Sequence, residues 1–196
     1  MQYEIKQVDK FRFIEEGEGQ PLVLLHGLFG ALSNFVDLVE YFKKHYKVVV
    51  TMLPLFDLDI LHTSVGGLAK FVNRFIEVRN YRNVHLLGNS LGGHVALIYV
   101  LKNPERIRSI ILTGSSGLFE SAMGDTYPKR GDYDYIKKKT ELTFYDPNIA
   151  SKELVDEVYE IINNRIKAIK IIALAKSAIR NNLGEELNQI KQPALL

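Results

Sequence analysis

Apolar residues form four short, nearly unbroken runs in the part of the chain before residue 115. The runs are Leu22–Leu25, Val48–Leu53, Val84–Leu87 and Ser109–Leu112. A strand that is exposed on one face alternates apolar and polar residues, whereas a parallel strand covered on both faces is apolar throughout. The runs therefore predict parallel strands of a buried sheet.

Between these runs, apolar residues recur every three or four positions, which is the period of an α-helix. This spacing covers about residues 33–46, then 65–76, and continues from Leu91 to Leu101. Alternation of strands with helices predicts an α/β fold with a doubly wound, mostly parallel sheet.

The pattern changes after Thr113, where the strand-like runs stop and helical spacing with charged faces begins. Ser151 is a typical N-cap for one helix, a second is predicted from Arg165 to about Ile179, and a short one from Glu185 to Ile190. We therefore divide the chain into core residues 1–117, a helical cap at 118–190, and the first residues of a further core strand at 191–196.

Composition and charge exclude several classes of function. The 196 residues carry a formal net charge of +2 without a dense basic run, which argues against nucleic-acid binding. The chain has no cysteine, which excludes disulfides, thiolate metal sites and a cysteine nucleophile. No His or Glu spacing resembles a metal ligand set. The glycine-rich residues 27–30 match neither Gly-x-Gly-x-x-Gly nor a phosphate loop that ends in Gly-Lys-Ser/Thr. We expect no metal and no cofactor.

The sequence also lacks the features of a secreted or membrane-spanning protein. Residues 1–6 contain no hydrophobic signal region. The most apolar later stretch, Ile161–Ala178, is interrupted by charged and amide side chains, which disfavour a position inside a bilayer. We therefore expect a cytoplasmic protein without a membrane span.

Residues 84–93 place a Gly-x-Ser-x-Gly motif between an apolar strand and a helix. A serine on such a tight turn projects its hydroxyl from the edge of the sheet, and small neighbours avoid clashes there. The motif predicts Ser90 as a catalytic nucleophile beside Gly88 and Gly92, at a helix N-terminus whose dipole favours negative charge. The alternative is a glycine-rich turn whose serine has no chemical role.

A second motif, Pro21–Gly30, is an apolar strand that ends in His26-Gly27 and leads into a helix. Acyl transfer builds negative charge on an oxygen in the transition state. Two rigid N–H groups stabilise this charge, with about 2.7–4 kcal/mol measured for one such donor. The predicted donors are the backbone N–H of Leu28, in the first loop, and that of Leu91, directly after the serine.

Together, His-Gly-Leu-Phe-Gly and Gly-Asn-Ser-Leu-Gly-Gly, each at the end of a strand, resemble the motifs of the α/β-hydrolase family. The resemblance covers essentially the whole chain, and the order of its elements is similar to that of small esterases and carbon–carbon bond hydrolases. It implies an α/β-hydrolase core with an inserted helical cap and a serine nucleophile. The supporting motif residues are His26, Gly27, Gly88, Asn89 and Gly92.

The family also implies a histidine base and a carboxylate, and here the sequence departs from its pattern. In relatives, the acid and the histidine follow strands beyond the cap, whereas this sequence stops at residues 192–196. Another acid position of the family is occupied here by Gly114–Gly117. We therefore expect a chain cut before its acid and base and poorly active by itself. Its last strand would be unpaired, which favours a homodimer through the sheet edge.

Each of the five histidines has a simpler structural explanation than catalysis. His26 is expected to shape the first loop, His45 to be exposed at a helix end, His85 to begin a strand, and His94 to point along its helix. His62, in the irregular 54–64 loop, is the one kept as an alternative base, since geometry and not sequence order defines a triad. Asp125 and Asp132 are expected to be surface or capping residues.

The predicted function is hydrolysis of a carboxylic ester or related acyl bond in a small-molecule substrate. Cleavage of a carbon–carbon bond in a diketone-like substrate is the nearest alternative, and a non-catalytic binding protein with the same fold is another. An apolar cap selects substrates mainly by shape, so the sequence does not identify the substrate.

Overall fold

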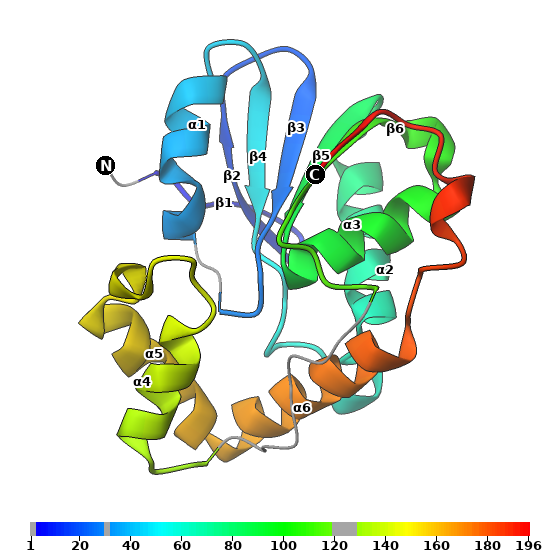
Figure 1. Ribbon diagram of the computed structural model, residues 1–196. Coiled ribbons are helices and arrows are strands. Elements are labelled where there is room, and N and C mark those ends of the chain that lie inside the picture. Colours follow the sequence, from blue (N-terminus) through cyan, green and yellow to red (C-terminus); the bar gives the residue numbers. More distant parts are fainter. Residues whose placement is uncertain (1–2, 30–31, 119–128) are drawn as a thin grey trace.

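A seven-stranded sheet lies at the centre of the computed structural model, which describes residues 3–29, 32–118 and 129–196 (Figure 1). The strand order is β1-β2-β4-β3-β5-β6-β7. The pairs β1/β2 and β2/β4 are antiparallel, and the other neighbouring pairs are parallel. The strands are β1 (Lys6–Val8), β2 (Phe11–Glu16), β3 (Pro21–Leu25), β4 (Lys47–Thr51), β5 (Val84–Asn89), β6 (Ile107–Thr113) and β7 (Ala194–Leu195).

Helices cover both faces of this sheet. Leu22 and Leu24 of β3 pack in a cluster with residues of α1 (Val36–Phe42). Val23 and Leu25 of the same strand belong to the larger cluster formed with α2 (Val65–Val78) and α3 (Leu91–Lys102). Because alternate residues of β3 are buried on opposite faces, its apolar run is unbroken. The predicted doubly wound α/β fold is confirmed.

The antiparallel edge formed by β1 and β2 is not predicted by the sequence patterns. In β2, Phe11 and Phe13 join the cluster of α2 and α3, whereas Ile14 joins the cluster of α1. Arg12 between the two phenylalanines is exposed. The strand therefore shows neither a clean alternation nor an unbroken apolar run. Its formation depends on pairing with β4, which is distant in sequence.

Between β6 and β7 the described chain is helical. We call α4 (Tyr133–Glu141), α5 (Lys152–Asn163) and α6 (Arg165–Arg180) the cap helices, because they lie within the segment predicted to be a cap. Figure 1 shows α4 and α5 beyond the end of the sheet to which β3 points, with α6 running from them toward α2. α5 and α6 agree with the predicted helices, and the Ser151 hydroxyl caps α5 by accepting a bond from the N–H of Leu154. The short 3-10 turns are η1 (Leu32–Phe35), η2 (Ile60–His62), η3 (Pro104–Arg106), η4 (Pro147–Ile149) and η5 (Leu187–Gln189).

The cap helices are buried in two different clusters. Ile136, Val158 and Ile162 form a small buried cluster of α4 and α5. α6 instead joins the main core, to which it contributes Leu174 and Ala178. No helix within the described ranges combines the length and the apolar character that a membrane crossing needs.

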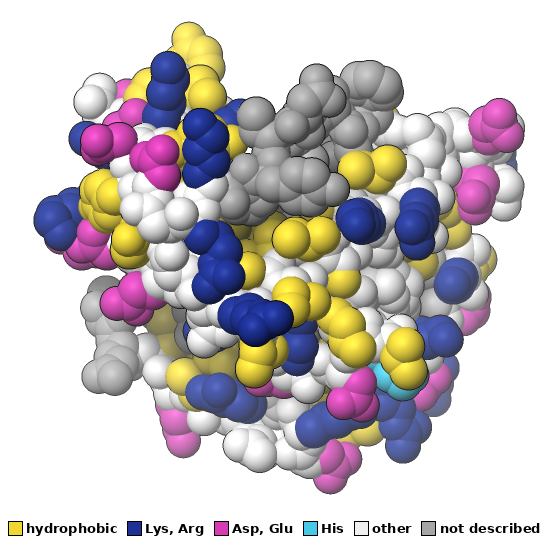
Figure 2. Space-filling view, turned by 90° about the horizontal axis from the view of Figure 1, so that it is seen from below, with side chains coloured by type: hydrophobic (Ala, Val, Ile, Leu, Met, Phe, Trp, Pro, Cys, Tyr) yellow, Lys and Arg dark blue, Asp and Glu magenta, His cyan; other side chains and the backbone are white. Residues whose placement is uncertain are grey.

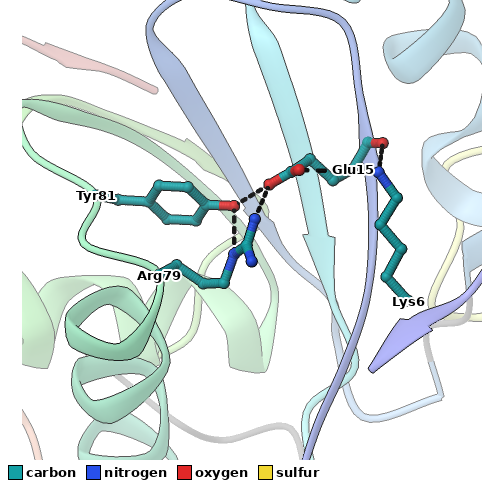
Figure 3. Close-up of polar contacts among 4 residues, drawn as sticks. All are labelled: Lys6, Glu15, Arg79 and Tyr81. Carbon is teal, nitrogen blue, oxygen red and sulfur yellow. Dashed lines mark hydrogen bonds and ion pairs between the residues drawn. The ribbon is translucent and has the colours of Figure 1, made fainter. Parts of the chain in front are cut away.

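A polar cluster fastens the end of α2 to β2 (Figure 3). The Arg79 guanidinium donates to the Glu15 carboxylate at 2.8 Å, and the Tyr81 hydroxyl donates to the same carboxylate oxygen. Lys6 adds an ion pair at 3.8 Å from the other side. Burial acts to raise the pKa of Glu15, but the bonds from Tyr81 and Arg79 outweigh it, so this pKa is lowered. The cluster keeps the Glu15 charge paired at the edge of the core.

Candidate active site

The candidate site lies where the order of the strands reverses. β4, which follows β3 in the chain, pairs on one side of β3, and β5 pairs on the other. In parallel α/β sheets, such a switch point opens a crevice at the carboxyl ends of the strands. The register places Leu25 beside Gly88 and Asn89 beside Thr113, so the ends of β3, β5 and β6 meet here.

Ser90 follows β5 directly in a strained backbone conformation, with φ 52° and ψ −118°. Residues other than glycine rarely adopt a positive φ, and such strain costs about 1–3 kcal/mol. The Ser90 N–H donates to the carbonyl of Thr113 at 3.0 Å, and the Ser90 carbonyl accepts from the N–H of Gly93 at 3.0 Å and of Ser116 at 3.2 Å. These bonds hold the turn from both sides.

The Ser90 side chain is exposed. Serine at a helix N-terminus usually caps the helix with its hydroxyl, but no such bond forms at the start of α3. Among the described residues, no side chain or backbone group hydrogen-bonds this hydroxyl. The oxygen is therefore free to meet a ligand.

The glycines of the two motifs allow a close approach of backbone segments. A Cβ on Gly88 would lie 2.5 Å from the Gly92 carbonyl oxygen, and one on Gly92 would lie 2.1 Å from the Leu25 carbonyl oxygen. A Cβ on Gly27 would lie 3.2 Å from the Ser90 Cβ. The loop after β3 thus lies directly against the serine turn, as an oxyanion-binding loop requires.

His26 holds this loop to the neighbouring strand. Its Nε2 accepts a hydrogen bond from the N–H of Leu53 at 3.0 Å, and its Nδ1 donates to the Gly27 carbonyl at 2.8 Å. Burial lowers the pKa of His26, which favours the neutral ring that these two bonds need. With both nitrogens occupied, His26 positions the loop and does not act as a base for Ser90.

The described residues leave the N–H groups of both predicted oxyanion donors available. Leu91 is the first residue of α3 and Leu28 lies in the loop after β3, and neither N–H has a partner among the described residues. Leu28 packs against the main core, while the next residue, Phe29, packs against the α4–α5 cluster. The loop is therefore in contact with both the sheet and the cap helices.

Asn89 is a structural member of the site. Its side-chain amide donates to the carbonyl oxygen and to the hydroxyl of Thr113, both at 3.1 Å. Sequence reasoning missed the supporting part played by Thr113 and Ser116, because it considered residues 114–117 only for a missing carboxylate. The signal available was the position of these residues at the end of the adjacent predicted strand.

None of the remaining histidines has a described hydrogen bond to the Ser90 hydroxyl. His94 Nε2 donates to the carbonyl of Asn181 at 2.9 Å, which joins α3 to the end of α6. His85 Nδ1 lies 2.7 Å from the hydroxyl of Ser109. His45 and His62 are exposed, and the described residues give neither of them a hydrogen bond to Ser90.

Of the two acids considered in the sequence, one is described, and it serves as a helix cap. Asp132 caps α4 by accepting from the N–H of Tyr135 at 2.9 Å, whereas Asp125 falls outside the described residues. Within the described ranges, no group of His, Asp and Glu residues could hold a metal ion.

Comparison with known proteins identifies the family. A family model described as "alpha/beta hydrolase fold" matches residues 20–143, which include both motifs. The chain belongs to the α/β-hydrolase fold family.

Individual relatives are similar over most of this chain. A dihydrolipoyllysine-residue acetyltransferase component of an acetoin cleaving system, from Cupriavidus necator, is 27% identical over 97% of this chain, which spans only 52% of that protein. A 2-hydroxy-6-oxononadienedioate/2-hydroxy-6-oxononatrienedioate hydrolase from Comamonas testosteroni is 26% identical over 93% of this chain and 71% of its own length. A monoacylglycerol lipase from Xenopus laevis is 24% identical over 98% of this chain and 66% of its own length.

A solved structure agrees with this assignment. MGS-MChE2, an alpha/beta hydrolase enzyme from the metagenome of lagoon sediments of Mar Chica, Morocco, is 41% identical. It matches with a TM-score of 0.78 over 97% of this chain and 73% of its own.

Proposed function

We propose that this chain carries the nucleophile and the oxyanion hole of a serine hydrolase that acts on a carboxylic ester or related acyl bond in a small-molecule substrate. The observation that carries the proposal is Ser90 at the carboxyl ends of β3, β5 and β6: its backbone is strained, and its exposed hydroxyl has no hydrogen bond among the described residues. Maintaining a strained serine whose hydroxyl does not cap its helix is expected where the hydroxyl has a chemical role.

In the proposed reaction, the Ser90 oxygen attacks the carbonyl carbon of the ester and its proton passes to a base. The N–H groups of Leu28 and Leu91 donate to the oxyanion that forms. The bond to the leaving oxygen then breaks, and the alcohol leaves with the proton. Water hydrolyses the resulting acyl-serine by the same steps and restores the hydroxyl.

We propose that the base and its carboxylate are not among the residues that the structure describes in contact with Ser90. His26 and His94 are held in backbone hydrogen bonds, His85 faces Ser109, and His45 and His62 have no bond to the serine. Without a base, a serine hydroxyl is a weak nucleophile. We therefore expect the 196-residue chain alone to hydrolyse only activated esters, and slowly.

Carbon–carbon bond hydrolysis is the second candidate. It is favoured by the similarity to the Comamonas testosteroni enzyme, whose name states hydrolysis of a 2-hydroxy-6-oxo dienedioate. The similarity to a monoacylglycerol lipase favours the ester instead. The two reactions use the same serine region in this proposal, so substrate assays have to separate them.

The test is hydrolysis of p-nitrophenyl acetate and of a vinylogous diketone by the 196-residue chain and by any longer form that its gene encodes. Ser90→Ala is the test variant, and Ser151→Ala, which removes only the cap of α5, is its control. In whichever form has the complete relay, Ser90→Ala should lower the rate by a factor of about 10³ or more. Ser151→Ala should leave the rate of folded protein unchanged.

The outcomes separate the alternatives. Full activity of the 196-residue chain would show that the base lies within it or comes from a partner copy, against our assignment of the histidines. A rate unaffected by Ser90→Ala would exclude the proposed nucleophile. No turnover of either substrate by either form would favour a non-catalytic binding protein.

A further inference from the structure

The outward face of α6 combines exposed aliphatic side chains with basic residues. The helix sequence contains five Lys and Arg residues and no Asp or Glu. Ala168, Ile171, Leu174 and Ala178 are buried. The other face includes Ile166, Ile169, Lys176 and Arg180, all exposed, and Ile166 keeps 68% of its surface accessible. Separations of three, seven and four residues place these four on one side of a helix.

The turn η2, which follows a loop bonded to α6, also exposes apolar side chains. Ile60 is 50% exposed and Leu61 is 90% exposed. The loop that leads into η2 is fixed to α6, because Lys170 Nζ donates to the carbonyls of Phe56 and Leu58, each at 2.7 Å. We call Ile60, Leu61, Ile166, Ile169, Lys176 and Arg180 the α6 surface.

Figure 2 views the molecule from the side on which α6 lies. Hydrophobic side chains gather across the middle of this face with lysine and arginine side chains beside them, while acidic side chains lie mostly toward its margins. Gathered apolar surface with charged neighbours marks an interaction site more often than scattered single residues do.

Four of the five basic residues of α6 divide into two groups by their contacts. Lys170 is used in the contacts with the loop, and Lys167 lies 5.4 Å from the ring of Phe56. Lys176 and Arg180, in contrast, form no ion pair with any carboxylate among the described residues. Asp57 and Asp59, which precede the turn η2, are exposed as well, so the positive charge of this surface belongs to α6. Two exposed cations are thus available next to exposed isoleucine and leucine.

We propose that the α6 surface docks on a bilayer that contains anionic lipids. Leu61, Ile166 and Ile169 would enter the boundary between headgroups and acyl chains, and Lys176 and Arg180 would meet lipid phosphates. An apolar helix face with basic residues and no acids is the composition that binds such an interface. Protein–protein interfaces instead favour aromatic residues and are depleted in lysine. This proposal does not depend on Ser90 chemistry.

The experiment is cosedimentation of the full chain with phosphatidylcholine vesicles, with and without phosphatidylglycerol. Three double variants are compared: Lys176→Glu/Arg180→Glu for charge, Leu61→Ser/Ile169→Ser for the apolar side chains, and Tyr41→Ser/Lys44→Glu as a matched control on and next to α1. All six positions are exposed, so each variant should fold, which circular dichroism checks.

We expect binding to the anionic vesicles that weakens as salt is added. Charge reversal should weaken it by about tenfold or more, because each basic residue near an anionic surface contributes a large fraction of a tenfold change. The apolar variant should also bind more weakly, and the control should bind like the parent. Absence of binding to anionic vesicles, or equal binding by all variants, would overturn the proposal. Binding of polyglutamate but not of vesicles would overturn it in favour of an acidic protein partner.

Discussion

Individual atoms around Ser90 hold its strained backbone in place. Hydrogen bonds from Gly93 and Ser116 converge on the Ser90 carbonyl, while its N–H is bonded to Thr113. The remaining space is filled by backbone, which leaves no volume for a side chain at Gly88 or Gly92. At the scale of the residue, the exposed hydroxyl is a consequence of close backbone packing behind it.

Replacing Gly88 by alanine should therefore destabilise the protein. The new Cβ would lie 2.5 Å from both the Gly92 carbonyl oxygen and the Gly93 Cα, and backbone atoms cannot move aside as a flexible side chain can. We expect a loss of about 1–3 kcal/mol or more in the free energy of unfolding. Gly66→Ala is the control, because nothing lies within 4 Å of its Cβ, and it should stabilise α2 by about 0.5–1 kcal/mol. Urea unfolding measures both, and equal effects would contradict the packing argument.

His26 should make stability depend on pH. Burial lowers its pKa below the ordinary value of 6.5, so the unfolded chain binds a proton more readily than the folded chain does. Its contribution is present above about pH 6.5 and is lost as pH falls through the folded-state pKa. Unfolding of the parent and of His26→Gln at several pH values should show a steeper acid loss in the parent. His85, whose pKa is lowered by burial and by Arg108, contributes equally to both proteins. Parallel curves would show that His26 is not held neutral.

At the scale of the element, the sequence patterns predicted those strands, helices and turns whose form is set by neighbouring residues of the same segment. The buried strands, α2, α3, α5 and α6 could be read from apolar spacing, and the serine turn and first loop from local glycine motifs. The helix expected at residues 33–46 is shorter, because η1 precedes α1 and the chain turns after Phe42. Three features could not be predicted, because each joins segments far apart in sequence. They are β2, the bonds of Ser116 to the serine turn, and the packing of Phe29 on the cap helices.

The polar cluster between α2 and β2 provides a test of such a long-range contact. Tyr81→Phe removes a hydroxyl that donates to the Glu15 carboxylate and accepts from Arg79 Nε at 3.2 Å. A hydrogen bond to a charged group contributes about 1.5–3 kcal/mol, so we expect a loss of that size at neutral pH. Tyr145→Phe, at a fully exposed position, should have no effect.

The same substitution should also change the acid dependence of stability. The pKa of Glu15 is lowered in the folded state, so its contribution is present above the ordinary value of 4.5 and is lost as pH falls through the folded-state pKa. Without the Tyr81 hydroxyl that pKa should rise toward its ordinary value, and the acid loss should shrink. Urea unfolding from neutral to acidic pH measures this, and an unchanged slope would contradict the assignment of Tyr81 as a donor.

At the scale of the whole molecule, the two sides of the sheet end differently. β1 pairs with β2 over three residue pairs, whereas β7 pairs with β6 at only two positions, Ala194 with Ile110 and Leu195 with Ile111. No strand in the described part of the chain pairs with the other side of β7. Leu195 is 65% exposed, so this edge presents both backbone hydrogen-bonding groups and an apolar side chain to solvent.

An edge of this kind is a template for pairing with a second copy, and charged residues on an edge strand are a common protection against it. A two-fold axis beside β7 would join two sheets and pair the same groups of both copies. We propose such pairing for the 196-residue chain, and expect light scattering to show a mass that rises from monomer toward dimer with concentration. Leu195→Lys should keep this chain monomeric. Leu142→Lys, at a similarly exposed leucine after α4, should leave the dimer intact. A monodisperse monomer at high concentration would contradict pairing through this edge, and a dimer that survives Leu195→Lys would place the contact on another surface.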